Sequence, residues 1–251
     1  MTTIDLNCDM GESFGAWKMG DDASIMPLIT SANIACGFHG GDPSTIRATV
    51  RRAVDAGVVI GAHPSLPDLM GFGRRNMRIT PAEMYDYIVY QAGAVEAFAR
   101  AAGARLHHVK AHGQLYNMAA VDQELALAMA RAVKDLGGGV QLYALSGSCM
   151  IQAAEQIGTP AVGEVFADRS YQDDGTLTPR SQPGAMIETE SRAVQQALGM
   201  IEQGVVTSLA GKTVAVAPGT LCLHGDQPGA AAFATALRVA FAERAITLKA
   251  P

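Results

Sequence analysis

The sequence predicts a parallel β/α barrel, and three observations support this prediction. The chain has 251 residues, a usual size for such a barrel. Short apolar segments alternate with amphipathic helical segments from end to end, an order typical of a parallel sheet covered by its crossover helices. Acidic residues and histidines follow most of the expected strands, where the active sites of barrels lie. No linker or repeat is evident, so we expect one barrel domain over residues 1–251.

Seven segments are expected to form the strands. Most neighbouring segments lie about 20–50 residues apart, as units of strand and crossover helix require. The segments are Ile4–Cys8, Asn33–Cys36, Val58–Ala62, Leu106–Ala111, Val140–Leu145, Val162–Phe166 and Leu221–Leu223. In addition, a hairpin strand is expected at Thr213–Ala217 and a final strand at Ile246–Lys249.

Helix start and stop signals lie between these segments. Thr80 and Glu83 form a capping box, in which each side chain binds the other residue's backbone N–H. Asp42 precedes Pro43, which fits an N-cap followed by a proline in the first turn. Such signals predict helices from Asp42 to Gly57, from Thr80 to Gly103, from Asp122 to Leu136, and over residues 186–203 and 228–244.

The composition excludes several classes of protein. With 49% hydrophobic and 17% charged residues, the chain can bury a large core, which excludes intrinsic disorder. Apolar runs end after about 6–8 residues, too few to cross a bilayer. The acidic N-terminus lacks the apolar region of a secretory signal, so we expect none. The net charge is −5 and no basic block occurs, so we expect no nucleic-acid partner.

The four cysteines are far apart and lie in apolar stretches: Cys8, Cys36, Cys149 and Cys222. This distribution predicts reduced thiols in the core of a cytoplasmic protein. No spacing of cysteine and histidine suggests structural zinc.

Charged residues and histidines follow six of the expected strands. Because the carboxyl ends of parallel strands meet on one face of a barrel, we expect these side chains to gather there. Four of the six histidines belong to this set, which favours a site over incidental loop histidines. The set is Asp9, Glu12, His39, Asp42, His63, His112, Glu164, Asp168, His224 and Asp226.

Alternation along the first strand places Asp5, Asn7 and Asp9 on one face. Polar groups that point into a barrel are costly unless they bind one another, a cation or a substrate. The opposite face, which carries Leu6 and Cys8, suits packing under helices.

In the fourth strand, His108, Lys110 and His112 share one face. A lysine in this position requires a carboxylate or an anionic ligand nearby. A structural ion pair with Asp5 or Asp9 is the alternative to a catalytic role. His107 points the other way, and we interpret it as a structural or surface residue.

Two long connections, His63–Thr80 and Asp168–Ala185, are expected to be functional. In the first, glycines flank Phe72 and would permit a flap over a ligand. Arg74 and Arg75 follow and can hold a carboxylate or phosphate. The alternative is a solvated turn whose arginines pair with helix-end carboxylates.

Two glycine-containing segments carry weaker signals. Gly211-Lys212-Thr213 resembles the end of a phosphate-binding P-loop, but Val206 stands where that motif requires its first glycine. The segment 37–41 lacks the order of a dinucleotide-binding loop, although the helix start after it leaves an anion site open.

Six motifs together resemble the LamB/YcsF family, whose members are known as the A subunit of a bacterial ATP-dependent 5-oxoprolinase. The resemblance covers nearly the whole chain. One departure is Ala111-His112-Gly113-Gln114, where the family usually has Pro-His-Gly-Ala; alanine in place of the proline affects only the shape of that loop. The motifs are the segments 5–12 (DLNCDMGE), 33–39 (NIACGFH), 61–65 (GAHPS), 109–113 (VKAHG), 164–169 (EVFADR) and 222–226 (CLHGD).

The resemblance implies a seven-stranded β/α barrel of the glycoside hydrolase/deacetylase type. It implies hydrolysis of 5-oxo-L-proline to L-glutamate, with ATP as co-substrate cleaved to ADP and phosphate, and partner subunits B and C. The residues leave open whether this chain or a partner binds ATP, and whether a divalent metal is bound.

Within the cluster, Asp9, Glu12 or a neutral histidine can act as general base toward water. Positive side chains can stabilise phosphate or carboxylate, and His112 or His224 can protonate the leaving nitrogen. The catalytic candidates are Asp9, Glu12, His39, His63, Lys110, His112, Asp168 and His224; the substrate-binding candidates are Asn7, Arg74, Arg75, Arg169 and Asp226.

Two other functions compete with this one. A metal-dependent amide or sugar N-deacetylase would use Asp9, His39 and His63 as ligands around an activated water. A non-catalytic scaffold would bind a lactam for its partner subunits, and its acids and histidines would be dispensable for turnover.

Overall fold

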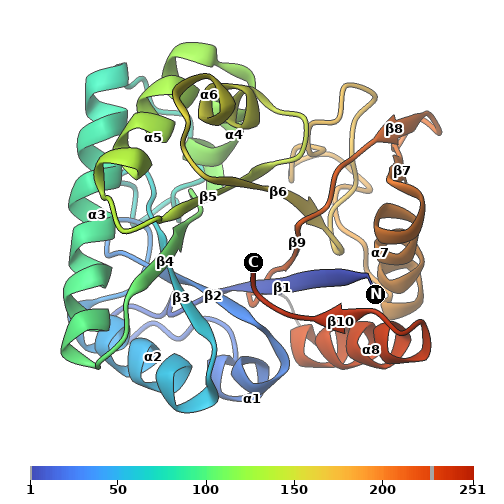
Figure 1. Cartoon of the computed structure of the whole chain (residues 1–251), viewed down its shortest axis with the longest axis horizontal. Coiled ribbons are helices and arrows are strands. Elements are labelled where there is room, and N and C mark those ends of the chain that lie inside the picture. The colour runs from blue at the N-terminus through green and yellow to red at the C-terminus, as the bar shows by residue number, and fades with distance from the viewer. Residues whose placement is uncertain (1, 227–228) are drawn as a thin grey trace.

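A computed structural model describes residues 2–226 and 229–251 of the chain. Seven parallel strands close into a barrel, in which β9 pairs with both β6 and β1 (Figure 1). The predicted seven-stranded parallel barrel is therefore confirmed. The strands are β1 (Thr3–Met10), β2 (Ser31–Ala35), β3 (Val59–His63), β4 (Leu106–Val109), β5 (Gln141–Leu145), β6 (Ala161–Phe166) and β9 (Thr220–Leu223).

Three short strands lie outside this barrel. β7 (Val205–Thr207) and β8 (Thr213–Ala215) form an antiparallel hairpin, as predicted for the second of them. β10 (Thr247–Leu248) extends the sheet beside the start of β1. Lys212 lies in the turn of the hairpin, where its backbone N–H donates to Ser208. A P-loop leads into a helix, so this turn between two strands does not fit one.

The predicted helices are present as α2 (Pro43–Ala56), α3 (Pro81–Ala101), α5 (Gln123–Asp135), α7 (Glu190–Gln203) and α8 (Ala230–Glu243). They surround the barrel (Figure 1). The helix predicted from residue 186 begins later, at Glu190, as α7. Met186 pairs with Arg169 in an isolated β-bridge, so it belongs to the connection after β6 and not to the helix. The predicted start of the last helix, residue 228, lies outside the described residues.

Four further helical segments were not predicted: α1 (Asp22–Ile25), a 3₁₀ turn η1 (Met26–Leu28), α4 (Gly113–Val121) and α6 (Cys149–Ile157). Within the described part of the chain, neither α4 nor α6 has a side-chain hydrogen bond at its N-cap. All four segments are also short, so they lack the long amphipathic pattern that identified the other helices.

The two faces of β1 have the environments that the alternation predicts. Leu6 and Cys8 are buried in the apolar layer between barrel and helices. Asp5 points inward, where Thr30, Ser31 and Thr220 donate to its carboxylate. Near the amino ends of the strands, the polar side chains inside the barrel are thus hydrogen-bonded to one another.

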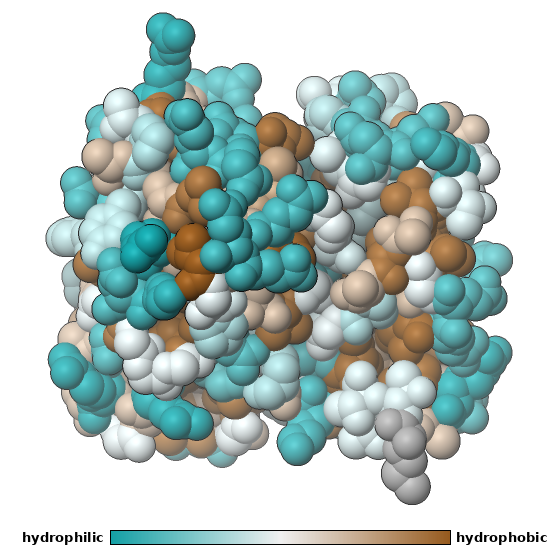
Figure 2. Space-filling model, turned by 45° about the horizontal axis from the view of Figure 1, so that its top comes forward, coloured by the Kyte–Doolittle hydropathy of each residue, from teal (hydrophilic) through white to brown (hydrophobic). Residues whose placement is uncertain are grey.

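Most of the large hydrophobic fraction lies in this core. On the face shown in Figure 2, brown hydrophobic side chains are separated by teal and white ones. Cys8, Cys36 and Cys222 are buried free thiols, and burial raises the pKa of each. Cys149 is only half-buried, because it lies in the first turn of α6. No helix in residues 2–226 and 229–251 is long and apolar enough to cross a membrane.

Candidate active site

A cavity of about 670 Å³ lies at the carboxyl ends of the strands. Strand geometry places the cluster here, because these residues lie at the ends of strands or in the connections that follow them. Seven of the predicted site residues line it: Asp9, His63, Arg74, Lys110, His112, Arg169 and His224. A second cavity of about 360 Å³ adjoins Glu12, His39 and Arg74. The sequence-predicted acids and histidines are therefore brought together at one end of the barrel.

Lys110 lies at the centre of the cluster. β4 ends at Val109, earlier than predicted, so Lys110 follows the strand and reaches across the barrel. Its Nζ lies 2.9 Å from Asp9 Oδ1, 3.0 Å from Glu164 Oε1 and 2.9 Å from Cys222 Sγ. Burial lowers the pKa of Lys110, but Asp9, Cys222 and Glu164 together outweigh it, so the pKa lies well above its ordinary value. Lys110 is thus both a buried ion-pair partner and a cavity residue.

Asn7 lies below the cavity and is fully buried. Its amide donates to Glu164 Oε1 at 3.0 Å and to Thr220 at 2.6 Å. Its Oδ1 accepts from Asn33 at 2.7 Å. Asn7 therefore positions Glu164. A substrate-binding residue would have to line the cavity, and Asn7 does not.

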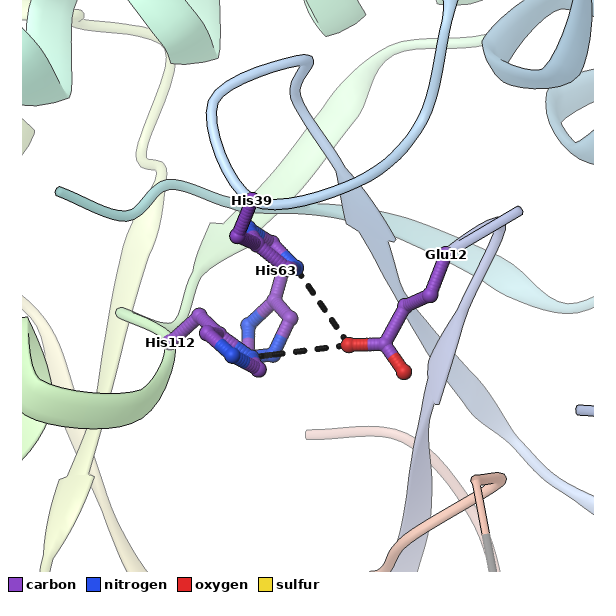
Figure 3. Close-up of side chains that lie close together, drawn as sticks. All are labelled: Glu12, His39, His63 and His112. Carbon is purple, nitrogen blue, oxygen red and sulfur yellow. Dashed lines mark hydrogen bonds and ion pairs between the residues drawn. The ribbon is translucent and has the colours of Figure 1, made fainter. Parts of the chain in front are cut away.

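Three histidines and one carboxylate form a compact group, which we call the Glu12 cluster: Glu12, His39, His63 and His112 (Figure 3). Glu12 Oε1 lies 3.3 Å from His39 Nε2 and 3.5 Å from His112 Nδ1. His63 Nε2 lies 3.0 Å from His112 Nδ1. All four residues are buried.

Backbone carbonyls fix the protonation of two of these rings. His63 Nδ1 lies 2.7 Å from the Lys110 carbonyl, and His112 Nε2 lies 2.8 Å from the Phe72 carbonyl. A carbonyl oxygen only accepts hydrogen bonds, so each of these nitrogens carries the proton. In the neutral rings, the other nitrogens, His63 Nε2 and His112 Nδ1, are then lone pairs directed into the cluster.

The groups of the cluster have strongly shifted pKa values. Burial and the neighbouring histidines hold the pKa of His39 and His112 well below the ordinary value. Burial and the Asp9 carboxylate raise the pKa of Glu12 well above its ordinary value. Burial also raises the pKa of Asp9, but His63 and Lys110 outweigh it and lower it well below the usual range. Such opposed shifts in one cavity are typical of functional sites.

His224 and Asp168 form a pair on the other side of the cavity. The ring Nδ1 lies 2.9 Å from Asp168 Oδ2, which also accepts from the His224 backbone N–H at 3.0 Å. Burial opposes ionisation of Asp168, but its contact with His224 outweighs this and lowers its pKa. His224 Nε2 lies 3.9 Å from Asp9 Oδ2. The carboxylate thus orients the imidazole, with Nε2 toward the acid at the centre.

The two neighbouring arginines have different surroundings. Arg74 lines the cavity, and its guanidinium binds Asp226 Oδ2 at 2.7 Å and covers the ring of Phe72. Arg75 is turned outward: its side chain is 67% exposed and pairs with Asp68 of the same loop. The structure therefore does not bring Arg75 to the site, because Asp68 holds its guanidinium at the surface.

The loops around the cavity are closed onto it. The predicted flap after β3 is fixed in place, since the Gly73 carbonyl accepts from the Gln114 backbone N–H at 2.9 Å. A Cβ atom at Gly73 would overlap Ser65 Oγ, so only glycine fits there. Arg169 holds the second loop by donating to the carbonyls of Thr178 and Ala185, and burial lowers its pKa to about 10.

Asp42 was expected among the residues that gather at the strand ends, but the structure shows it as the N-cap of α2. The Asp42 carboxylate accepts from the backbone N–H groups of Ser44, Thr45 and Gly15. An anion at this helix start would have to displace the residue's own cap.

Two residues of the site had no predicted catalytic or substrate-binding role, although Glu164 belongs to the set expected at the strand ends. Glu164 pairs with Lys110 and accepts from the Tyr116 hydroxyl at 2.7 Å. Glu164 alternates with apolar neighbours in β6, a signal that could have identified it as inward-pointing. Tyr116 belongs to the unpredicted helix α4, so no strand-end pattern could place it.

Fold and site together define a class: seven-stranded parallel β/α barrels with a buried acid, histidine and lysine centre at the carboxyl ends of the strands. Within that class, the chain belongs to the LamB/YcsF family, whose family model matches residues 4–251. The predicted membership of this family is confirmed.

Comparison with known proteins adds three findings. The chain is 59% identical to the A subunit of 5-oxoprolinase from Bordetella parapertussis over 247 residues, 98% of each chain. It is 46% identical, with a TM-score of 0.93 and full coverage of both chains, to the crystal structure of a lactam utilization protein from Thermus thermophilus. A family 4 carbohydrate esterase from Streptomyces lividans is 12% identical with a TM-score of 0.52, covering 98% of this chain and 91% of that one. This last likeness concerns the fold alone.

Proposed function

We propose that this chain is the A subunit of an ATP-dependent 5-oxoprolinase and that it opens the ring of 5-oxo-L-proline to give L-glutamate. The observation that carries the proposal is its 59% identity, over 98% of both chains, to a protein named as the A subunit of 5-oxoprolinase. The cluster of acids, histidines and Lys110 in the cavity supports it, because hydrolysis of an amide requires proton transfer and charge stabilisation.

Resonance stabilises the lactam, so its hydrolysis requires activation. Phosphoryl transfer from ATP to the amide oxygen releases ADP and makes the ring carbon electrophilic. Water then adds to this carbon, the C–N bond breaks and the ring nitrogen takes up a proton. A second water molecule releases the phosphate, which gives glutamate, ADP and inorganic phosphate.

The geometry supports a division of roles among the residues. His224, held by Asp168, is suited to deliver a proton to the ring nitrogen. His112 is less suited, because both of its ring nitrogens are engaged. Asp9 is suited to accept a proton from the attacking water, since its low pKa keeps it ionised. Lys110, Arg74 and Arg169 line the cavity as positive charges for carboxylate or phosphate.

Partner subunits B and C complete the enzyme in this proposal. The segment that resembles a P-loop lies in the β7–β8 hairpin, so we assign nucleotide binding to the partners. Buried free thiols and the requirement for ATP favour a cytoplasmic location.

The test is ATP-dependent release of glutamate from 5-oxoproline, with and without subunits B and C. We expect turnover only in the complete complex, and no ATPase activity from the purified chain alone. Asp9→Asn is nearly isosteric and should block glutamate formation while the complex still assembles. ATPase activity of the isolated chain would overturn the assignment of the nucleotide to the partners. A fully active Asp9→Asn complex would favour the non-catalytic scaffold.

A deacetylase acting on amides or amino sugars is the second candidate. The observation that favours it is the Glu12 cluster, whose donor types suit a catalytic metal. In place of the predicted ligand set of Asp9, His39 and His63, the structure groups His39 and His63 with Glu12 and His112. Acetate release from N-acetylglucosamine oligomers by the isolated chain would support this candidate over the first.

A further inference from the structure

We propose that the Glu12 cluster binds one divalent transition-metal ion, with Glu12 Oε1, His63 Nε2 and His112 Nδ1 as ligands and His39 Nε2 as the fourth. The first argument is the direction of the lone pairs. His63 Nε2 and His112 Nδ1 face each other at 3.0 Å, although both neutral rings carry their protons on the opposite nitrogens. Two lone pairs at this distance repel each other unless a proton on His63 Nε2 or a metal ion lies between them.

The neighbouring acceptors strengthen this argument. Asp9 Oδ2 lies 3.2 Å from His63 Nε2, and Glu12 Oε1 lies 3.5 Å from His112 Nδ1. The centre of the cluster is therefore bounded by nitrogen lone pairs and carboxylate oxygens, all of them buried. Removing such groups from water is costly unless a positive charge compensates them.

The spacing also fits a metal. Zinc binds imidazole nitrogen at about 2.0–2.1 Å, which puts tetrahedral ligands about 3.3–3.4 Å apart. The measured separations of 3.0, 3.3 and 3.5 Å lie around this value. One ligand atom from each of the four residues lies within 4.8 Å of the others.

The second coordination sphere is already built. Metal-binding histidines usually donate their other N–H to a carbonyl or carboxylate, which fixes the tautomer. The Lys110 and Phe72 carbonyls do this for His63 and His112. The His39 ring lies parallel to the His112 ring with the centroids 3.7 Å apart, so the two rings cannot bind one ion without a turn of His39. His39 Nδ1 is buried and has no hydrogen-bond partner among the described residues, so no hydrogen bond at that nitrogen opposes the turn.

A neighbouring group of possible ligands lacks this character. Asp9, Cys222 and His224 also lie within 4.8 Å of one another. Lys110 Nζ, however, is 2.9 Å from both Asp9 Oδ1 and Cys222 Sγ, so an ammonium already supplies the positive charge there. The Glu12 cluster is the other of the two groups in the described part of the chain, and no ammonium group lies among its ligand atoms. It also adjoins both cavities.

The test uses the full chain and measures metal binding directly, so its result does not depend on the proposed 5-oxoprolinase activity. Chelator-treated protein is titrated with Zn²⁺ in a calorimeter, and the zinc-loaded protein is examined by X-ray absorption. We expect one ion per chain, bound by nitrogen and oxygen at about 2.0–2.1 Å without sulfur. A sulfur ligand at about 2.3 Å would place the ion at Cys222 and overturn the proposal.

Variants separate the cluster from its surroundings. Glu12→Gln and His112→Asn should each weaken zinc binding by more than about 100-fold, beyond the effect of losing an outer-sphere contact. His224→Asn, also buried at the same cavity, is the matched control and should keep the wild-type affinity. Glu12→Gln keeps the shape of the side chain, so it tests the site even if the histidine variant does not fold.

Two further results would overturn the proposal. One is the absence of stoichiometric binding of Zn²⁺, Co²⁺ and Mn²⁺ to the folded wild-type chain. In that case, nitrogen NMR should show a proton on His63 Nε2, which then supplies the charge between the lone pairs. The other is wild-type zinc affinity in Glu12→Gln.

Discussion

Asp168 Oδ2 accepts two hydrogen bonds from His224, one from its backbone N–H at 3.0 Å and one from its ring Nδ1 at 2.9 Å. The carboxylate therefore holds both the backbone and the ring of the same residue. Since the acceptor is a carboxylate, Nδ1 carries a proton and Nε2 is the nitrogen that faces the cavity.

Asp168→Asn should uncouple this pair with little change in shape. An amide NH₂ beside the ring favours the opposite tautomer, so Nε2 loses its role in proton transfer. We expect kcat for glutamate release by the complete complex to fall by roughly 10²–10⁴-fold, the usual contribution of general acid–base catalysis.

The control for this prediction is Asp173→Asn in the same loop, whose side chain binds Ser208 away from the histidine. It should leave kcat close to the wild-type value. If Asp168→Asn also retains wild-type kcat, His224 does not transfer the proton in the proposed reaction.

Lys110→Met should destabilise the fold as well as abolish turnover. The substitution leaves Asp9 and Glu164 buried close together without their shared cation. Breaking a buried ion pair in this way costs about 3–5 kcal/mol of unfolding free energy. Urea denaturation of the two proteins measures the difference.

A second substitution distinguishes charge from packing. Lys110→Met combined with Glu164→Gln removes one of the two uncompensated carboxylates and should recover part of the lost stability. If the double variant is as unstable as Lys110→Met alone, lost packing of the lysine is the cause.

The inner faces of β1 and β4 could be predicted because strand alternation alone decides them. Asp5, Asn7 and Asp9 point inward as expected, and Lys110 pairs with Asp9, one of its two predicted partners. Alternation is a local property of the chain, so it needs no knowledge of the tertiary structure.

Other features of the site depend on contacts between distant segments. The tautomers of His63 and His112 are set by the carbonyls of Lys110 and Phe72, and no sequence pattern encodes which carbonyl a ring meets. The outward direction of Arg75 is decided by Asp68, which lies in a loop without periodicity. Neighbouring arginines of one loop therefore cannot be distinguished from the sequence.

Arg74→Ala and Arg75→Ala test this distinction directly. Arg74 lines the cavity, so its loss should raise KM for 5-oxoproline by about 10-fold or more, since hydrogen bonds to charged groups contribute about 1.5–3 kcal/mol. Arg75 forms an exposed pair at the surface, which contributes little to stability, and its loss should leave KM unchanged. Equal effects of the two substitutions would contradict the assignment of Arg74 to substrate.

The N-cap of α2 predicts a dependence of stability on pH that is separate from the active site. The Asp42 carboxylate accepts from Gly15, Ser44 and Thr45, and these bonds lower its pKa to about 2. Because the folded pKa lies below the unfolded value of about 3.9, the ionised cap stabilises the fold above that value. This contribution is lost as the pH falls from about 4 toward 2.

Asp42→Ala should lower the unfolding free energy by about 0.5–2 kcal/mol at pH 7, the usual cost of losing an N-cap. Asp42→Asn keeps a side-chain acceptor but cannot ionise, so it removes the pH-dependent part alone. Urea denaturation at pH 6, 5, 4 and 3 should therefore show the difference between wild type and Asp42→Asn shrinking at the acidic end. A difference that stays constant over this range would show that the Asp42 carboxylate does not have the lowered pKa on which the prediction rests.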